Sequence, residues 1–414
     1  MVKGVVTSII TAAVLMCGLV GCGYSDSENT EEGPTDAGGV NYSFKECTNS
    51  NQEMCWNWNP TAEENGCGVE TDDSSENTAE RLENEYCWIH KVYRPYVSVE
   101  PPSTVFESIG QEQKNRSQKL IDYGWNSPLD TPATYFLTSD LSPDSLNIVK
   151  SGIQAAENYL GAYGPMRVYV IGSDTSATEA AIQDYCNWSY NTNEIEMCEN
   201  DQGIGIYEMA YYEGSNAFAQ HSRHRSEPTQ AFVIGNPLGI GPADGSKVAA
   251  HEYVHIYTQA HQMYQSADLY GLEWPIWIEE CSAEFLALYL ADQEGWLSFR
   301  ERMEESLRTT QSLRELIPNL TIKDLADDRD RVREYCGLCF GQLQYDTGQW
   351  ATAWLVHHSS LDAFFFDFFP NAYDLGIDGA FETAFNLTID EFYAAFEKFL
   401  ELPISEQMAI LPTP

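Results

Sequence analysis

Two histidines and a glutamate between residues 251 and 255 have the types and the spacing of a metal-dependent hydrolase. The segment reads His-Glu-Tyr-Val-His, so His251 and His255 are four residues apart and Glu252 follows the first of them. On a helix with about 3.6 residues per turn, both imidazoles stand on one face and can reach one zinc ion. Glu252 is then placed to take a proton from water on that ion. The motif predicts hydrolysis by zinc-activated water, with Glu252 as general base.

A catalytic zinc site has a third protein ligand and keeps a fourth position for water. Glu280 is the first candidate, because it lies in an apolar segment, Trp277 to Phe285, that follows a proline and is typical of a buried helix. Glu284 lies one turn after Glu280 on the same face. Its carboxylate can hydrogen-bond the far nitrogen of a zinc-bound histidine and fix the tautomer of that ring. The predicted zinc ligands are therefore His251, His255 and Glu280, with Glu284 behind them.

His261 is the alternative third ligand. It completes the spacing H-E-x-x-H-x5-H, which resembles the metzincin family, where a glycine three residues after the second histidine breaks the helix. Here that position is Thr258, and no helix breaker precedes His261. On a continuing helix, six residues beyond His255 turn the side chain by about 240°, to the wrong face. This geometry favours Glu280 over a metzincin-like arrangement.

The two segments together resemble the gluzincin group of metallopeptidases. The His-Glu-Tyr-Val-His run and the Glu-Glu-x-x-Ala-Glu-Phe run that begins at Glu279 are similar to bacterial collagenase-type catalytic domains. One departure is Cys281, which stands where those families usually have glycine after the ligand glutamate. The resemblance covers about residues 230 to 401. It implies a zinc metallopeptidase that hydrolyses a peptide or protein substrate.

A third segment, from Tyr345 to Gly348, is similar to the Tyr-x-x-Gly helix start of aminopeptidase-type gluzincins. In that group the tyrosine hydroxyl stabilises the tetrahedral oxyanion, so the resemblance implies this role for Tyr345. A phenol opposite the zinc can donate to the charge that develops on the attacked carbonyl oxygen. His357 and His358 are the next candidates for the same role.

The substrate is less well indicated by the sequence than the chemistry. The Gly-x-Met-Glu-Asn segment, by which aminopeptidase-type gluzincins hold a free amine, is absent from the chain, and no collagen-binding module is recognisable. Two other classes therefore stand beside a peptidase: a hydrolase of some other amide, and a non-catalytic surface or binding lipoprotein with a structural or vestigial zinc site. The presence of Glu252 and Tyr345 argues against the non-catalytic class, because a structural site needs neither.

The pattern around these segments predicts an α+β body with the order of a zincin. Apolar periodicity and turn residues predict helices from 143 to 163, from 175 to about 190 and from about 246 onward, and strands over 166–171 and 230–234. Beyond that point the chain reads as mostly helical to about residue 401. The order favours a small N-terminal sheet with an edge strand, followed by a mostly helical gluzincin-like catalytic subdomain, with the metallopeptidase domain over residues 140–404.

The first residues read as a targeting signal. Lys3 gives a positive start, and Val5 to Val20 is an apolar stretch that is short for a membrane span. It ends in Leu-Val-Gly-Cys, which resembles the bacterial lipobox and implies lipidation of Cys22. We therefore expect a lipoprotein signal peptide over 1–21 and a flexible tether over 22–39, in an exported protein with membrane contact only through its lipid. Gly23 after the cysteine favours the outer membrane.

Cysteine usage agrees with export. Four cysteines lie close together in a segment, residues 40–100, that we read as a small Cys-rich, disulfide-stapled module; Cys186 and Cys198 form a second local set, and Cys336 and Cys339 a third. An oxidising compartment pairs such local sets and leaves Cys281 outside them. A zinc knuckle is the alternative for the first set, but its spacing is irregular and lacks paired C-x-x-C units. That set comprises Cys47, Cys55, Cys67 and Cys87.

The chain is strongly acidic and well supplied with core-forming side chains. Of its 414 residues, 63 are acidic and 22 basic, which gives a formal net charge of −41. Nucleic acid and anionic lipid surfaces both require a basic footprint, so the composition excludes either as the main partner. Hydrophobic residues make up 43% and aromatic residues 13%, which excludes disorder of the whole chain.

Overall fold

The computed structural model describes most of the chain beyond residue 124 and three short strands before it. The described ranges are 55–58, 79–81, 88–92, 124, 126–129, 131–211, 216–222, 225, 229–266, 275–317, 320–327 and 339–414. The predicted signal peptide, Cys22, the tether and Cys336 lie outside the described residues. None of the helices within these ranges combines the length and the apolar character that a bilayer span requires.

The chain divides into two units, one containing residues 22–103 and the other residues 104–414. In the first unit, strands β1 (Cys55–Trp58), β2 (Ala79–Arg81) and β3 (Trp88–Val92) form an antiparallel sheet of order β1-β3-β2. These strands fall within the stretch predicted as a Cys-rich module.

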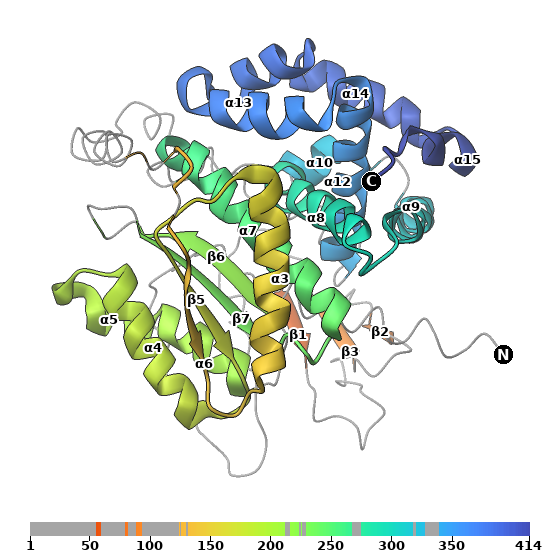
Figure 1. The fold of residues 1–414 in the computed structure, drawn as a ribbon. Coiled ribbons are helices and arrows are strands. Elements are labelled where there is room, and N and C mark those ends of the chain that lie inside the picture. Colours follow the sequence, from red (N-terminus) through yellow and green to blue (C-terminus); the bar gives the residue numbers. More distant parts are fainter. Residues whose placement is uncertain are drawn as a thin grey trace. The chain divides into compact units, whose positions relative to one another are not determined.

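A four-stranded mixed sheet lies at the N-terminal end of the described part of the second unit (Figure 1). Its strands are β4 (Thr134–Leu137), β5 (Met166–Ile171), β6 (Ala217–His221) and β7 (Gln230–Gly235), in the order β4-β5-β7-β6. The first three of these in spatial order are parallel, whereas β6 runs antiparallel to β7. The strand next to β7 at one edge of the sheet is therefore β6.

Helices cover both faces of this sheet, which explains the nearly continuous apolar sequence of β5. Val168 and Val170 contribute to the core beneath α3 and α7, whereas Tyr169 and Ile171 contribute to a second core beneath α4 and α6. Alternation of side chains along a strand sends successive residues to opposite faces, so a strand covered on both sides is apolar throughout.

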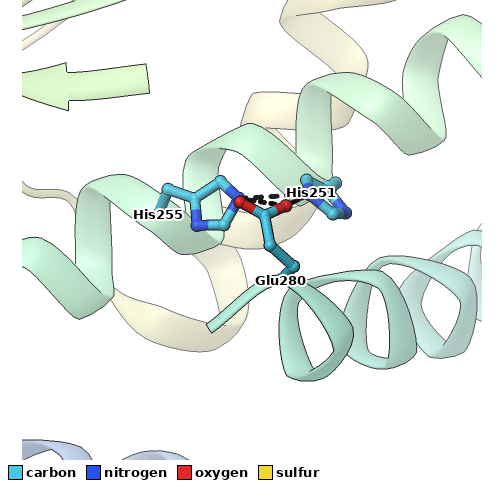
Figure 2. A group of neighbouring side chains, drawn as sticks. All are labelled: His251, His255 and Glu280. Atoms are coloured by element: carbon cyan, nitrogen blue, oxygen red, sulfur yellow. Dashed lines mark hydrogen bonds and ion pairs between the residues drawn. The ribbon is translucent and has the colours of Figure 1, made fainter. Parts of the chain in front are cut away.

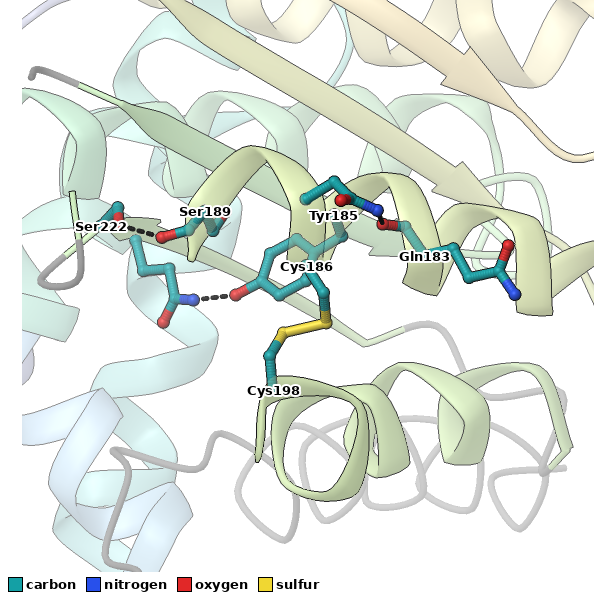
Figure 3. Close-up of a disulfide and its surroundings, with 8 residues drawn as sticks. Gln183, Tyr185, Cys186, Ser189, Cys198 and Ser222 are labelled. Atoms are coloured by element: carbon teal, nitrogen blue, oxygen red, sulfur yellow. Dashed lines mark hydrogen bonds between the residues drawn. A yellow bond between two sulfur atoms is a disulfide. The ribbon is translucent and has the colours of Figure 1, made fainter. Parts of the chain in front are cut away.

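Helices α3 (Pro143–Leu160) and α7 (Pro242–Ser266) pack closely against each other on one face. Their approach requires glycine at position 152, because a Cβ atom there would lie 2.1 Å from the carbonyl oxygen of Ser246. The other face carries α4 (Thr175–Ser189), the 3-10 turn Thr192–Glu194, α5 (Ile195–Asn200) and α6 (Gln202–Tyr211). A disulfide between Cys186 and Cys198 joins α4 to α5, as predicted from their proximity in sequence (Figure 3).

The described residues of the remainder of the chain are mostly helical. The elements are α8 (Ile276–Gln293), α9 (Phe299–Leu316), α10 (Ile322–Asp327), α12 (Cys339–His358), the π-helical segment Ala363–Phe368, α13 (Phe369–Phe385), α14 (Ile389–Leu400), α15 (Ile404–Gln407) and the 3-10 turn Met408–Ile410. Buried aromatic rings from α8, α12, α13 and α14 fill the space between these helices. The described part of the second unit is thus mostly helical with one small mixed sheet, and its class is α+β.

Several element boundaries differ from the sequence prediction. The helix expected to reach Tyr163 ends at Leu160, and the helix expected from about Ser246 begins at Pro242, one turn earlier. The helix predicted to open at Tyr345 begins at Cys339, so Tyr345 lies in its interior. Strands β4 and β6 and helices α5 and α6 were not individually predicted.

Candidate metal centre

Helix α7 presents the two motif histidines on one fixed face. It is continuous from Pro242 to Ser266, and its Tyr253, Val254 and Tyr257 are buried in the main core. The packing of these side chains fixes the rotation of the helix about its own axis. His251 and His255 then stand one turn apart, buried beneath α8.

Helix α8 supplies the acidic ligand from the opposite side. Trp277, Ile278 and Cys281 are fully or almost fully buried, and they fix the helix against its neighbours. Glu280 lies between these residues in the sequence and is also buried, with 8% of its surface exposed. A carboxylate that deep inside a protein requires a cation or hydrogen-bond donors beside it.

The three predicted ligands meet at one point (Figure 2). Nε2 of His251 and Nε2 of His255 are 3.1 Å apart, and Oε2 of Glu280 lies 3.4 Å from each of them. Ligand atoms about 2.0–2.1 Å from one tetrahedral zinc ion are about 3.3 Å from each other. Within the described part of the chain this is the one cluster of three or more histidine, cysteine or acidic side chains able to hold a metal ion. Its donor types and spacing fit zinc.

A second carboxylate orients His251. Oε2 of Glu284 lies 3.0 Å from Nδ1 of His251, which is the contact that the one-turn spacing between Glu280 and Glu284 predicted. The same carboxylate accepts hydrogen bonds from Nζ of Lys247 at 2.7 and 2.9 Å. Nδ1 is thereby held as a protonated nitrogen, so a metal ion would take the place of the proton at Nε2.

The charges of this cluster are strongly coupled. Although burial opposes the protonated form, hydrogen bonds that His251 donates to Glu280 and Glu284 raise the pKa of its imidazole to about 10. Burial also opposes ionisation of Glu280, but the two histidines hold the pKa of that carboxyl well below its usual value. For Glu284, Lys247 and His251 outweigh burial and lower the pKa to about 2. Without a metal, protons on the imidazoles therefore supply the positive charge that the carboxylates require.

The proposed base, Glu252, lies beside the cluster and is itself buried, with 6% of its surface exposed. Burial raises the pKa of Glu252 above its ordinary value, and the neighbouring histidines oppose that rise. A general base works best when its pKa approaches the working pH, so this shift is in the useful direction.

Tyr345 reaches the same cluster from a third helix. Its hydroxyl donates to Oε2 of Glu280 at 2.5 Å, across the contact between α12 and α8. That contact is close because position 348 is glycine: a Cβ atom there would lie 2.4 Å from Sγ of Cys281. The gluzincin resemblance implies a glycine at position 281. The larger cysteine that stands there is accommodated because the facing helix has a glycine at position 348. Sγ of Cys281 donates to the carbonyl of Gln344 at 3.4 Å.

The alternative ligand His261 is directed elsewhere. The helix continues through it, and Nε2 of His261 lies 3.2 Å from the hydroxyl of Tyr163, between the rings of Tyr163 and Tyr257. Burial lowers the pKa of His261 to about 4, so the ring is neutral in the folded protein at physiological pH. His261 does not belong to the metal-ligating cluster.

The two alternatives for the oxyanion role lie at the exposed end of α12. The ring of His358 stacks on Trp354 with centroids 3.8 Å apart, and its Nδ1 lies 2.8 Å from the carbonyl oxygen of the same residue. His357 packs edge-on against His358. Tyr345, by contrast, contacts a proposed metal ligand directly.

Comparison of the chain with protein-family models, with curated proteins and with solved structures finds no match. The assignment of this site therefore depends on its geometry and on the motifs. Two contributing residues were not identified from sequence: Lys247, one turn before His251, and Gly348 in its packing role. In the sequence, Lys247 resembles any solvated lysine on a helix. Only the packing of α8 against α7 shows that it is buried.

Proposed function

We propose that this protein is a zinc-dependent hydrolase of peptide bonds with a gluzincin-like catalytic subdomain. The observation that carries the proposal is the convergence of His251, His255 and Glu280 at tetrahedral zinc distances, with Glu252 buried beside them. A structural zinc site is usually closed by four protein ligands, whereas three ligands with a nearby carboxylate are typical of catalysis.

A bound zinc ion would polarise the scissile carbonyl and make the attacking water more acidic. Glu252 takes a proton from that water as it attacks and passes the proton to the nitrogen of the leaving amine. The hydroxyl of Tyr345, which lies at the ligand Glu280, donates to the carbonyl oxygen as negative charge develops on it. Glu284 keeps His251 in the tautomer that offers Nε2, and Lys247 keeps Glu284 ionised and in place.

The decisive experiment combines metal analysis with digestion of an unlabelled protein mixture, in which the new chain ends are read by mass spectrometry. We expect about one zinc per chain and new termini that are absent from the Glu252→Gln control. Glu252→Gln removes the base without removing a ligand, so it should keep zinc and fold but lose most turnover.

Each possible outcome has a distinct meaning. Equal cleavage by wild type and Glu252→Gln would refute the mechanism. A zinc-loaded wild type that cuts no protein or peptide would instead favour hydrolysis of another amide, or a binding protein with a structural site. Zinc loss in His261→Ala with full occupancy in Glu280→Ala would restore the metzincin-like alternative.

We also propose that the enzyme is exported and held in the outer membrane by a lipid on Cys22. The support is the Leu-Val-Gly-Cys sequence after the apolar signal, together with Gly23, and the disulfide between Cys186 and Cys198 agrees with an oxidising compartment. The mature protein should begin at Cys22 and partition into detergent, and Cys22→Ser should release it. Recovery of wild-type protein in a wholly soluble, unlipidated form would contradict the anchor.

A further inference from the structure

Strand β6 turns one set of backbone groups away from its partner. The amide of Ser222 donates to the carbonyl of Thr229 at 2.8 Å, and the amide of Gly235 donates to the carbonyl of Asn216 at 2.7 Å. The backbone N–H and C=O groups of residues 216 and 222 therefore point toward β7. In an antiparallel pair the facing alternates along the strand. The N–H and C=O groups of residues 217, 219 and 221 consequently point to the outer edge of the sheet.

A side chain of helix α7 occupies two of these outer groups. Nε2 of Gln259 donates to the carbonyl of Ala219 at 3.0 Å, and the amide of His221 donates to Oε1 of Gln259 at 2.7 Å. A carboxamide carries the same donor and acceptor as a peptide unit, so Gln259 satisfies the edge as one residue of an added strand would. Another outer amide, that of Ala217, donates to Oδ1 of Asn216 at 2.9 Å.

The strand that carries these groups is held in place on its other side. The side chain of Gln220 donates to the hydroxyl of Tyr185 on α4. The hydroxyl of Ser222 donates to the carbonyl of Ser189 on the same helix (Figure 3). The edge groups therefore have fixed positions. An incoming backbone can pair with the carbonyl of Ala219 and the amide of His221 only if the carboxamide of Gln259 leaves.

This covered edge is adjacent to the metal centre. Gln259 follows His255 by four residues on the continuous helix α7, so the two side chains are one turn, about 6 Å, apart along the axis. An extended peptide is commonly recognised by pairing its backbone with an exposed strand edge, which holds several residues at once. A peptide that passes the metal cluster toward β6 meets the carboxamide of Gln259 in place of open backbone groups.

We propose that Gln259 determines substrate length: it closes the β6 edge to an extended chain, and so favours peptides that are short on that side of the scissile bond. This inference rests on the proposed peptidase function. A longer substrate gains backbone pairing with Ala219 and His221 only by breaking the two hydrogen bonds of Gln259, so the net gain from the added residues is small.

The experiment compares wild type with Gln259→Leu, which shortens the side chain by its terminal amide atoms and so removes both hydrogen-bonding groups from the edge. The substrates are one cleavable peptide and the same peptide lengthened stepwise on each side of the scissile bond. For the longest peptide on the β6 side, the variant should have a KM about ten-fold lower, since two edge hydrogen bonds are released to the substrate. The shortest peptide should show no change, and the turnover number should stay near that of wild type.

A second measurement needs no substrate. Backbone amide exchange at His221 should be faster in Gln259→Leu than in wild type, because its acceptor has been removed. Gln259→Glu should show intermediate KM values, since it keeps the acceptor for His221 but places a second oxygen against the carbonyl of Ala219. Gln259→Glu also tests the proposal if the leucine variant fails to fold.

The outcomes separate this inference from the proposed function. Equal length dependence in wild type and variant, with cleavage intact, would overturn the role of Gln259 alone. A turnover number that falls equally for all lengths would also overturn it, because Gln259 would then only fasten β6 to α7. Absence of cleavage in both forms would overturn the proposed function and the length limit with it.

Discussion

Lys247, which is buried, and Glu284, which is partly buried, form an ion pair directly behind a proposed metal ligand. Nζ of Lys247 lies 2.7 and 2.9 Å from the two carboxylate oxygens, and 6% and 16% of the two side chains are exposed. The second partner of that carboxylate is Nδ1 of His251. The pair therefore joins the stability of the fold to the orientation of the metal ligand.

Lys247→Met should destabilise the metal-free protein strongly, because it leaves the carboxylate of Glu284 buried beside one remaining partner. Breaking a buried pair in this way costs about 3–5 kcal/mol of the free energy of unfolding. Urea denaturation after removal of metal with a chelator measures the change. The matched control is Arg308→Met, which breaks the exposed pair with Glu304 and should cost less than about 1 kcal/mol. Equal effects of the two variants would contradict the role assigned to Lys247.

Zinc retention should separate the two candidate third ligands. Glu280→Ala removes a ligand atom and should release zinc, whereas His261→Ala removes a ring that faces Tyr163 and should leave the zinc content unchanged. Glu284→Gln should lie between them, since loss of a carboxylate behind a ligand histidine typically weakens metal binding by about 10- to 100-fold. Competition with a chromogenic chelator gives all three affinities.

The stability of the metal-free protein should fall in alkaline solution. The pKa of His251 is raised to about 10 in the folded protein by Glu280 and Glu284, against an ordinary value of 6.5. The protonated ring therefore stabilises the fold fully below pH 6.5, and this contribution is lost as the pH rises toward 10. Zinc replaces the proton at Nε2, so the zinc-loaded protein should not lose it.

Melting temperatures at pH 6.5 and pH 9.5, with and without chelator, measure this difference. A metal-free protein whose melting temperature is unchanged between these two values would show that the imidazole is not protonated in the folded state. The same proton competition predicts that zinc affinity rises with pH across this range.

The parts of the site that depend on local geometry were predictable from sequence. His251 and His255 share a face on any helix, so their spacing alone predicted a common metal. Glu280 required a second helix to pack against the first, and it was identified because its apolar surroundings indicated a buried helix. Lys247 and Gln259 were not identified, because their roles depend on what α8 and β6 bring beside them.

The same distinction explains which strands were found. Strands β5 and β7 are covered on both faces, so each is an apolar run that stands out in the sequence. Strand β6, Ala-Phe-Ala-Gln-His, lies at the edge and mixes small and polar residues. Tyr345 was placed at a helix start by its motif, but the helix begins at Cys339, and only the packing of α12 on α8 shows that the hydroxyl meets Glu280.

Tyr345→Phe tests the last member of the site, because its hydroxyl has two possible tasks. In the metal-free structure it donates to Oε2 of Glu280, and hydrogen bonds to charged groups contribute about 1.5–3 kcal/mol to stability. The metal-free variant should lose stability in that range. If the hydroxyl binds the oxyanion only as the carbonyl becomes tetrahedral, turnover should fall about 100- to 1,000-fold while KM changes little.

Zinc affinity distinguishes the two tasks of this hydroxyl. We expect the affinity of Tyr345→Phe for zinc to match that of wild type, because the phenol is not a ligand and the metal takes over the charge of Glu280. Near-normal turnover together with weakened zinc binding would show instead that Tyr345 orients Glu280. The oxyanion donor would then have to be another group, with His357 and His358 the next to be replaced. The three proposed zinc ligands would keep their assignments, because none of the distances that define them involves Tyr345.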